Sequence, residues 1–553
     1  MRKHTHILIT VLLAIATTIT AGAQENLRTG YFLDGYNRAY KMNPALQIER
    51  GFFTFIPNVG VGVESNLGLG TILYPTESGN LTTFMNESVL SEDFLSKLNN
   101  NNLINVNANV DIISIGFWSK KSYHTLDLGV HAGVGVSLPK ELFQFAKVGS
   151  ADGTTHFDLS NLGVQADARL EAAYGFSTSI KNVMTIGFRA KFLMGLAHAN
   201  ANISNMQLDA SGEQWRIKGN GTLDVSFPGL RLLTNEESGT AATPQENDYL
   251  SWQFETPTGQ DIMDGYLKHP KSFGGAIDFG MNFNLGKYVN LSMSVCDLGV
   301  MSWGNLTQAA MPDSEEGWVF NGFDNMAFND PSFNLGDQFT ALGNDLKNTV
   351  NFKRLREGAS KVKMLAPITY LGLQAKMPFY DRMSIGVLGT RRFDKQYSFT
   401  EVRASLNWAL LRWLSLSANY AYSDLGHSFG GALNIHCKGF NLYVGSDSFW
   451  PLFKVTPQYI PVYNANTNVA VGIVFACGKY HGPYPKKIKN KTVQDVLDET
   501  ELTEFEQASL EDLEVTDHVK QSQESTNQSK ETKKQSKKQK KQEKVAEIPV
   551  KIV

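Results

Sequence analysis

The sequence feature that most limits the fold is a pair of long alternating runs between Gly163 and Leu196. Apolar residues occupy every second position of each run, charged or small polar residues lie between them, and residues 180–183 separate the two runs. Because successive side chains of a strand point to opposite faces, the pattern predicts a hairpin with one apolar and one charged wall. Each run exceeds the ~5–6 residues of a usual soluble strand and reaches the roughly 9–11 that cross a membrane. Alone, this hairpin fits a soluble sandwich or barrel as well as a membrane barrel.

The rest of the chain favours the membrane barrel. Alternating segments predict strands over residues 51–63, 103–117, 126–138, 163–179, 184–196, 277–285, 289–295, 368–377, 383–390, 397–410, 414–423, 430–436, 440–445 and 468–475. Tight connections alternate strictly with other connections, the longest over residues 74–102, 139–162, 199–271, 304–367 and 447–467. This segregation is typical of outer-membrane barrels. We predict an all-β fold, a closed antiparallel transmembrane β-barrel of about 14 strands. A count of about 16 stays open, because residues 215–227 are treated as an excursion hairpin within a loop.

One face of these strands carries charges of both signs. On the lipid face an Arg or Lys would cost ~2–4 kcal/mol at the membrane midplane. We therefore expect a salt-bridged lumen lined by Asp127, His131, Asp167, Arg169, Glu171, Arg189, Lys191, Glu401 and Arg403. Aromatic residues near strand ends predict the interfacial girdles, although core aromatics are the alternative. They are Tyr174, Phe176, Trp408 and Phe475 at one end and Tyr420 and Tyr422 at the other.

The N-terminal region divides into two parts before the barrel. Residues 1–23 combine a basic start, a short apolar run and a small-residue site, which predicts a signal peptide cleaved after Ala23. Residues 24–50 do not alternate, carry several aromatics and precede the first strand, so we expect a plug inside the barrel rather than a flexible leader. In this plug, Asp34 and Arg38 are expected to pair with the charged wall. The tripeptide Asn43, Pro44 and Ala45 is expected to turn the chain into the first strand.

Residues 51–478 are expected to form the barrel, and the chain changes character after it. Residues 479–553 run from a Pro/Lys linker through an acidic segment to a Lys/Gln-rich end, which predicts a disordered tail. Because the last strand should run inward, we expect this tail, like the N-terminus, in the periplasm, away from nucleic acid. A solvated tail without a specific role is the alternative.

Enzyme and cofactor signatures are missing from the sequence. It holds no Gly-x-Ser-x-Gly, no His-Glu-x-x-His and no phosphate loop, and its three cysteines lie too far apart for a disulfide framework or a zinc site. Asp127 and His131 share the lumen face, as a hydrolase pair would, but a lumen histidine with satisfied hydrogen bonds explains them more simply. We expect neither an enzyme nor a cofactor.

Three short motifs carry a family resemblance: residues 36–45 (Tyr-Asn-Arg-Ala-Tyr-Lys-Met-Asn-Pro-Ala), Asp297-Leu298-Gly299 with Trp303, and residues 443–447. The signal peptide, the Asn-Pro-Ala segment within the first motif and the strand count resemble the FadL-like outer-membrane transport barrels of Gram-negative bacteria. The three motifs are more similar to the Bacteroidetes relatives of that class, the PorV-like and PorP-like barrels and a related family of unknown function. The FadL-like resemblance implies that the Asn-Pro-Ala segment belongs to an N-terminal plug. The charged lumen departs from a simple hydrophobic tunnel.

Two classes of function fit these observations. One is a channel or transporter for hydrophobic or amphipathic small molecules, seated in outer-membrane lipid. The other is an interaction barrel without transport, an accessory to protein secretion or cell-envelope assembly that binds periplasmic or surface proteins through its tail and outer loops.

Overall fold

The computed structural model describes residues 26–76, 81–149, 153–180, 183–211, 215–227, 231–241, 243–255, 271–311, 318–320, 352–394, 397–449, 466–479 and 481, with positions 258, 260 and 266. Residues 1–482 form one compact unit and residues 483–553 a second. The predicted signal peptide and the predicted tail from residue 482 onward lie outside the described residues.

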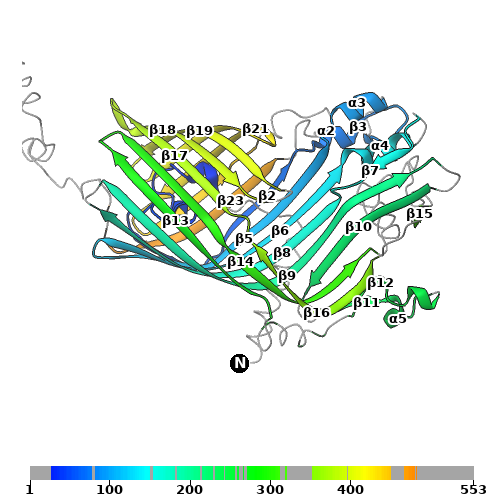
Figure 1. Cartoon of the computed structure of the whole chain (residues 1–553). Helices are drawn as coiled ribbons and strands as arrows, with labels where there is room; N and C mark the ends of the chain where they lie inside the picture. Colours follow the sequence, from blue (N-terminus) through cyan, green and yellow to red (C-terminus); the bar gives the residue numbers. More distant parts are fainter. Residues whose placement is uncertain are drawn as a thin grey trace, which may run out of the picture. The chain divides into compact units, whose positions relative to one another are not determined.

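The main sheet closes on itself as an antiparallel barrel of 14 strands, as predicted (Figure 1). The first strand is made of two pieces, β1 Gly51–Thr54 and β2 Asn58–Ser65, which both pair with β5 on one side and with the last strand β23 on the other. The other strands are β5 Asn101–Ser119, β6 Ser122–Pro139, β8 Gly163–Ile180, β9 Met184–Asp209, β13 Phe273–Leu285, β14 Val289–Ala310, β17 Ile368–Met377, β18 Tyr380–Arg392, β19 Phe399–Leu411, β20 Leu414–Ser423, β21 Gly426–His436, β22 Phe440–Ser446 and β23 Thr467–Cys477.

One side of the barrel continues as a tall wall beyond the shorter strands (Figure 1). Four further strands extend it: β7 His156–Asp158 and β10 Trp215–Ser226 pair with β9, β15 Trp318–Phe320 pairs with β10, and β16 Lys353–Met364 pairs with β14. The predicted excursion hairpin at 215–227 is therefore wrong, since these residues continue the wall above β13. The predicted loop at 304–367 likewise contains a strand, β16.

The ends of two predicted strands also need correction. β9 reaches Asp209 rather than Leu196, and β14 reaches Ala310 rather than Val295. Past the belt of apolar side chains, the outer face of the wall is polar, with exposed Asn202, Ser204 and Gln207 on β9. A prediction that requires an apolar outer face therefore ends each of these strands too early.

Most connections at one end of the barrel are tight, and the larger ones lie at the other end, called here the long-loop end. The alternation is not strict, however. β20 and β21 are joined at the long-loop end by residues 424–425 alone, where Gly426 adopts φ +98°. His427, predicted to lie in a loop, belongs to β21, and its ring packs against Tyr420 and Tyr422.

The outer face of the barrel is apolar at positions that a soluble protein would bury. Phe192 is 56% exposed, Leu371 56% and Val402 54%. In each case the preceding residue of the strand carries a polar group and is buried on the inner face. The predicted girdle residue Phe475 stacks on Phe53 and Phe55 with ring centroids about 5.5 Å apart. Such a belt on a closed barrel is the architecture that spans outer membranes. Among the helices in the described ranges, none has the length and hydropathy of a membrane span.

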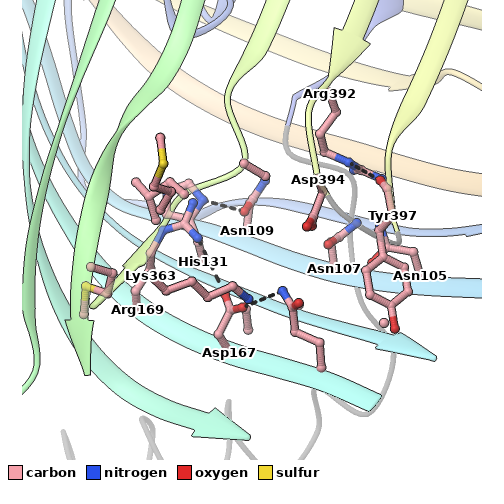
Figure 2. Close-up of a pocket in the computed structure, with 18 of the residues that line it drawn as sticks. Asn105, Asn107, Asn109, His131, Asp167, Arg169, Lys363, Arg392, Asp394 and Tyr397 are labelled. Atoms are coloured by element: carbon pink, nitrogen blue, oxygen red, sulfur yellow. Dashed lines mark hydrogen bonds and ion pairs between the residues drawn. The ribbon is translucent and has the colours of Figure 1, made fainter. Parts of the chain in front are cut away.

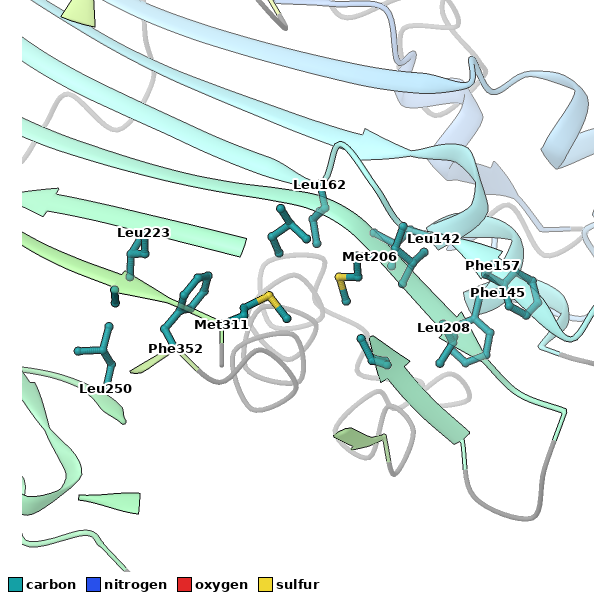
Figure 3. Close-up of a cluster of buried hydrophobic side chains, with 14 of the residues drawn as sticks. Leu142, Phe145, Phe157, Leu162, Met206, Leu208, Leu223, Leu250, Met311 and Phe352 are labelled. Carbon is teal, nitrogen blue, oxygen red and sulfur yellow. The ribbon is translucent and has the colours of Figure 1, made fainter. Parts of the chain in front are cut away.

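The larger connections fold over the long-loop end and carry their own apolar cores. A cluster joins the tall wall to α4 Lys140–Val148 and β7 (Figure 3). Its side chains include Leu142, Phe145, Phe157, Met206, Leu208, Leu223, Met311 and Phe352. The remaining small elements are α2 Leu69–Ile72, β3 Leu73–Pro75, β4 Leu81–Thr83, α3 Ser91–Ser96, β11 Arg231–Thr234, α5 Asn235–Ser238, the 3-10 turn Pro244–Glu246 and β12 Leu250–Glu255.

Candidate functional site inside the barrel

Residues 26–50, called here the inner segment, lie inside the barrel (Figure 1). The segment contains two short 3-10 turns, Arg28–Gly30 and Ala39–Lys41, and its aromatic side chains reach strands on several sides of the lumen. Tyr31 donates from its hydroxyl to Ser292 Oγ at 3.0 Å, and Tyr36 packs edge-on against Tyr443. The segment is therefore held by contacts all round the barrel.

The Asn-Pro-Ala tripeptide makes a turn deep in the lumen. Asn43 Oδ1 accepts a hydrogen bond from Ala45 N at 2.9 Å, and its Nδ2 donates to backbone carbonyls of β13 and β14. Room for this turn comes from Gly187 and Gly280, where an added Cβ would lie 2.2 Å from Pro44 and 2.0 Å from Asn43. From the sequence we expected this turn to lead directly into the first strand. It does not, because residues 46–50 separate it from β1.

The two predicted charged residues of this segment have different surroundings. Arg38 is 2% exposed, and its guanidinium lies 3.2 Å from Asp111, 3.9 Å from Asp127 and 2.7 Å from Ser114 Oγ. Lys41 also contacts Asp111. Asp34 instead lies near His436, and its backbone carbonyl accepts a hydrogen bond from Asn434. The charged wall thus receives Arg38, and Asp34 belongs to the opposite side of the barrel.

A buried network joins five neighbouring strands of the charged wall. Arg189 lies 3.0 Å from Asp127, 3.1 Å from Glu171 and 3.4 Å from Asp278. Lys191 lies 2.9 Å from Asp278 and 2.6 Å from Asp297. Asp297 reaches this network through a bulge at which its backbone has φ +59°. Because each carboxylate faces at least one cation, the network is a set of compensated charges.

A second network anchors the start of the inner segment. Arg403 makes a two-pronged contact with Glu401, both bonds at 2.9 Å. Arg28 lies 3.2 Å from Glu401 and 3.3 Å from Glu64, while the backbone NH groups of Arg28 and Thr29 donate to Asp447. The segment is therefore tied to β2, β19 and the end of β22 at one point, and to β5 and β6 at another.

The remaining predicted lumen residues line an open pocket toward the long-loop end (Figure 2). His131 bonds Asn109 Oδ1 through Nδ1 at 2.7 Å and approaches Glu171 through Nε2 at 3.6 Å. Arg169 lies 3.6 Å from Asp167. His131 is therefore a lumen histidine with two polar neighbours. Neither neighbour is a nucleophile that the histidine could activate as a base.

The pocket has a polar and an apolar side. One polar side comes from β5, β6 and β8, and the apolar side comes from β14, the end of β16 and residues 365–366, with Lys363, Arg392, Asp394 and Tyr397 as further polar groups. The empty space is about 910 Å³ when the open solvent at the mouth is counted. The lining residues are Asn105, Asn107, Asn109, His131, Ala132, Gly133, Gly135, Gln165, Asp167, Arg169, Met301, Trp303, Lys363, Met364, Leu365, Ala366, Arg392, Asp394 and Tyr397. An amphipathic molecule would match both sides.

A second, smaller cavity lies between this pocket and the inner segment. Its lining residues are Asn26 and Lys41 of the segment with His131, Arg169, Glu171, Arg189, Lys191, Cys296, Asp297, Ile368 and Tyr370. His131 and Arg169 also line the open pocket, so these two side chains stand between the two spaces. In the parts of the chain that the structure describes, no cluster of three or more His, Cys, Asp or Glu side chains could hold a metal ion.

Sequence reasoning brought together the nine lumen residues but missed their partners Glu64, Asp111, Asp278, Asp297 and Asp447. Asp278 lies in the alternating pattern of β13 and was recognisable there. Asp297 and Asp447 occur in the motifs that carried the family resemblance, but no role followed from their positions. Arg28 pairs with Asp447 across more than 400 residues, which no local pattern reveals.

These features define a class of protein: a closed membrane-type β-barrel with a segment inside its lumen and an open pocket above that segment. The model of one family, described as a family of unknown function (DUF5723), matches residues 44–447. The chain belongs to this family. No curated protein matches it.

Solved structures similar to this chain include two toluene transporters and a FadL homologue. The Pseudomonas putida toluene transporter TodX is 8% identical with a TM-score of 0.35, over 82% of this chain and 95% of that one. The Ralstonia pickettii toluene transporter TbuX is 8% identical with a TM-score of 0.35, over 81% and 95%. A Pseudomonas aeruginosa FadL homologue is 10% identical with a TM-score of 0.34, over 83% and 98%. At TM-scores this low, the description of the barrel rests on its own strand pairings.

Proposed function

We propose that this protein is an outer-membrane transport barrel for an amphipathic small molecule, with residues 24–50 as its plug. One observation carries the proposal: the open pocket and a second cavity share His131 and Arg169 in their linings, and Lys41 of the inner segment lines the second cavity. A solute that enters the pocket would meet the plug next. Passage would then require the plug to shift.

The orientation belongs to the same proposal. Outer-membrane barrels place short turns in the periplasm and larger loops outside. We therefore place both termini in the periplasm and the pocket mouth toward the cell surface, with the apolar belt in outer-membrane lipid.

The proposal is tested by filling the pocket. Gly133 lies on its floor, so Gly133→Trp should slow the entry of small amphipathic solutes into vesicles that contain the full chain. It should also deplete small molecules that co-purify with the protein, measured by mass spectrometry. Gly439→Trp is the matched control, because no atom lies within 4 Å of an added Cβ there. Equal solute entry in the two variants would contradict the transport proposal.

A second candidate function is an interaction barrel that acts in protein secretion or envelope assembly, like the PorV-like and PorP-like barrels of Bacteroidetes. The tall wall favours it, because the loops on this wall bury a full apolar core of their own. A folded platform of this kind, on the side of the barrel that we place outside, suits surface protein partners.

Co-isolation separates the two candidates. Proteins that are captured with the full chain and lost when residues 486–553 are deleted would favour the interaction barrel. If the same deletion leaves solute entry unchanged, transport would require the barrel but not the deleted residues.

A further inference from the structure

The polar side of the pocket is a ladder of side-chain amides. Asn105, Asn107 and Asn109 alternate along β5, so their side chains share the inner face at intervals of ~7 Å (Figure 2). Asn107 lies opposite Gly133 and Asn105 opposite Gly135 on β6. On the other side, Gly133 faces Asp167 and Gly135 faces Gln165 of β8. Gly133 leaves a trough between the amides of β5 and the polar side chains of β8, and the ring of Tyr397 fills the space over Gly135.

Two polar groups of this trough have unused hydrogen-bonding capacity. Asn107 Nδ2 and the Tyr397 hydroxyl are buried atoms without a hydrogen-bond partner among the described residues. The Tyr397 side chain is 5% exposed, and its ring covers Gly135, where an added Cβ would lie 2.7 Å away. A bound molecule with donor and acceptor groups could satisfy both, because an amide offers two donors and an acceptor, and a phenol offers one donor.

Two of the three cations that line the pocket are paired with carboxylates of the protein. Arg169 pairs with Asp167, and Arg392 lies 3.2 Å from Glu64. The lining as a whole carries three cations, Arg169, Lys363 and Arg392, against the two anions Asp167 and Asp394. A strongly charged ligand would have to replace pairs that already exist, so the lining favours a neutral one.

The apolar side limits the ligand further. Met301 and Trp303 of β14 line it, and one face of Trp303 is stacked on His198 with ring centroids 4.6 Å apart. Opposite the amides, this side offers contact to carbon and hydrogen but few hydrogen bonds. A molecule that matches the whole lining has hydroxyl groups along one edge and an apolar face.

From this lining we infer that the transported molecule is a saccharide or a compound with a saccharide part. The inference rests on the proposed transport function and specifies its substrate class. Pyranose rings are neutral, present neighbouring hydroxyls that side-chain amides can bridge, and have C–H faces that pack on apolar and aromatic surfaces. An acyl chain would instead strip water from the amide ladder without replacing its hydrogen bonds.

Calorimetric titration of the full-length protein, in a polyoxyethylene detergent without a sugar headgroup, tests the inference. The probes are maltose, cellobiose and diacetylchitobiose, with laurate and inorganic phosphate as the competing classes. At least one disaccharide should bind. Asn107→Leu should lower the affinity for that disaccharide roughly tenfold through the loss of one hydrogen-bonding group. The matched control is Asn220→Leu on the exposed outer face of β10, which should bind like the unchanged protein.

If Asn107→Leu fails to fold, Tyr397→Phe is the second variant. It removes a single hydroxyl and should lower the affinity for the same disaccharide severalfold. Binding of laurate or phosphate without any disaccharide would overturn the saccharide inference and leave the transport proposal standing. If none of the five probes binds, the inference is overturned as well. Failure of the transport proposal has a different signature, because Gly133→Trp would then leave solute entry unchanged.

Discussion

Replacing Arg38 tests how the inner segment is held. Arg38→Met keeps most of the apolar stem but removes the guanidinium that lies 3.2 Å from Asp111 and 2.7 Å from Ser114. Breaking a buried ion pair by removing one partner costs roughly 3–5 kcal/mol, because the other charge stays buried. Asp111 keeps Lys41 and Asp127 keeps Arg189. We therefore expect the lower end, a loss of about 3 kcal/mol in the free energy of unfolding.

Urea unfolding in lipid vesicles, followed by tryptophan fluorescence, measures this loss. The control is Lys97→Met, which breaks a 2.8 Å pair with Asp93 whose side chains are 39% and 55% exposed. A surface pair of this kind contributes about 0.5 kcal/mol or less. If Arg38→Met costs no more than Lys97→Met, the network does not hold the segment in place.

Three further predictions concern other parts of the chain. Deleting residues 486–553 should leave heat-modifiable migration and the unfolding transition unchanged, because the barrel's pairings close without them; failed insertion would contradict this. Cysteine at Phe192 should react with a lipid-soluble thiol reagent, and cysteine at Lys191 should not; the reverse pattern would show the register to be wrong. In α5, hydrogen bonds from Arg354 lower the pKa of Glu237 from 4.5 to about 2. A lowered pKa stabilises the folded loop at neutral pH, and this contribution is lost as the pH falls from about 4.5 toward 2. Pepsin should therefore cut this loop faster at pH 2 than at pH 4 in the unchanged protein, and Glu237→Gln should reduce the difference while Glu236→Gln keeps it.

Much of the barrel was predictable because the membrane imposes one rule on each strand. Between Met184 and Leu196, the side chains facing lipid are apolar, and the lumen-facing positions are polar or glycine apart from Leu193, so alternation alone placed Arg189 and Lys191 on the inner face. From Ala199 to Asp209 the outer face meets water instead. There the sequence no longer distinguishes a strand from a loop.

The candidate site was predictable only in part, because its contacts are made between distant strands. Alternation marks Glu171 and Arg189 as inward-facing but does not say that Asp278 completes their network. Asp297 enters it through a bulge, which shifts a side chain by one position against the pattern. The path of the inner segment depends on space left by Gly187 and Gly280, and a missing side chain gives no signal of what fills its place.

Single-channel conductance in planar bilayers tests the central claim, that the inner segment closes the lumen. A variant lacking residues 25–40 removes Arg28 and Arg38 and leaves every barrel strand intact. Its folding is checked independently by heat-modifiable migration. We predict that the folded variant conducts markedly more than the full chain under the same conditions. Equal conductance in a folded variant would show that the segment does not obstruct the pore.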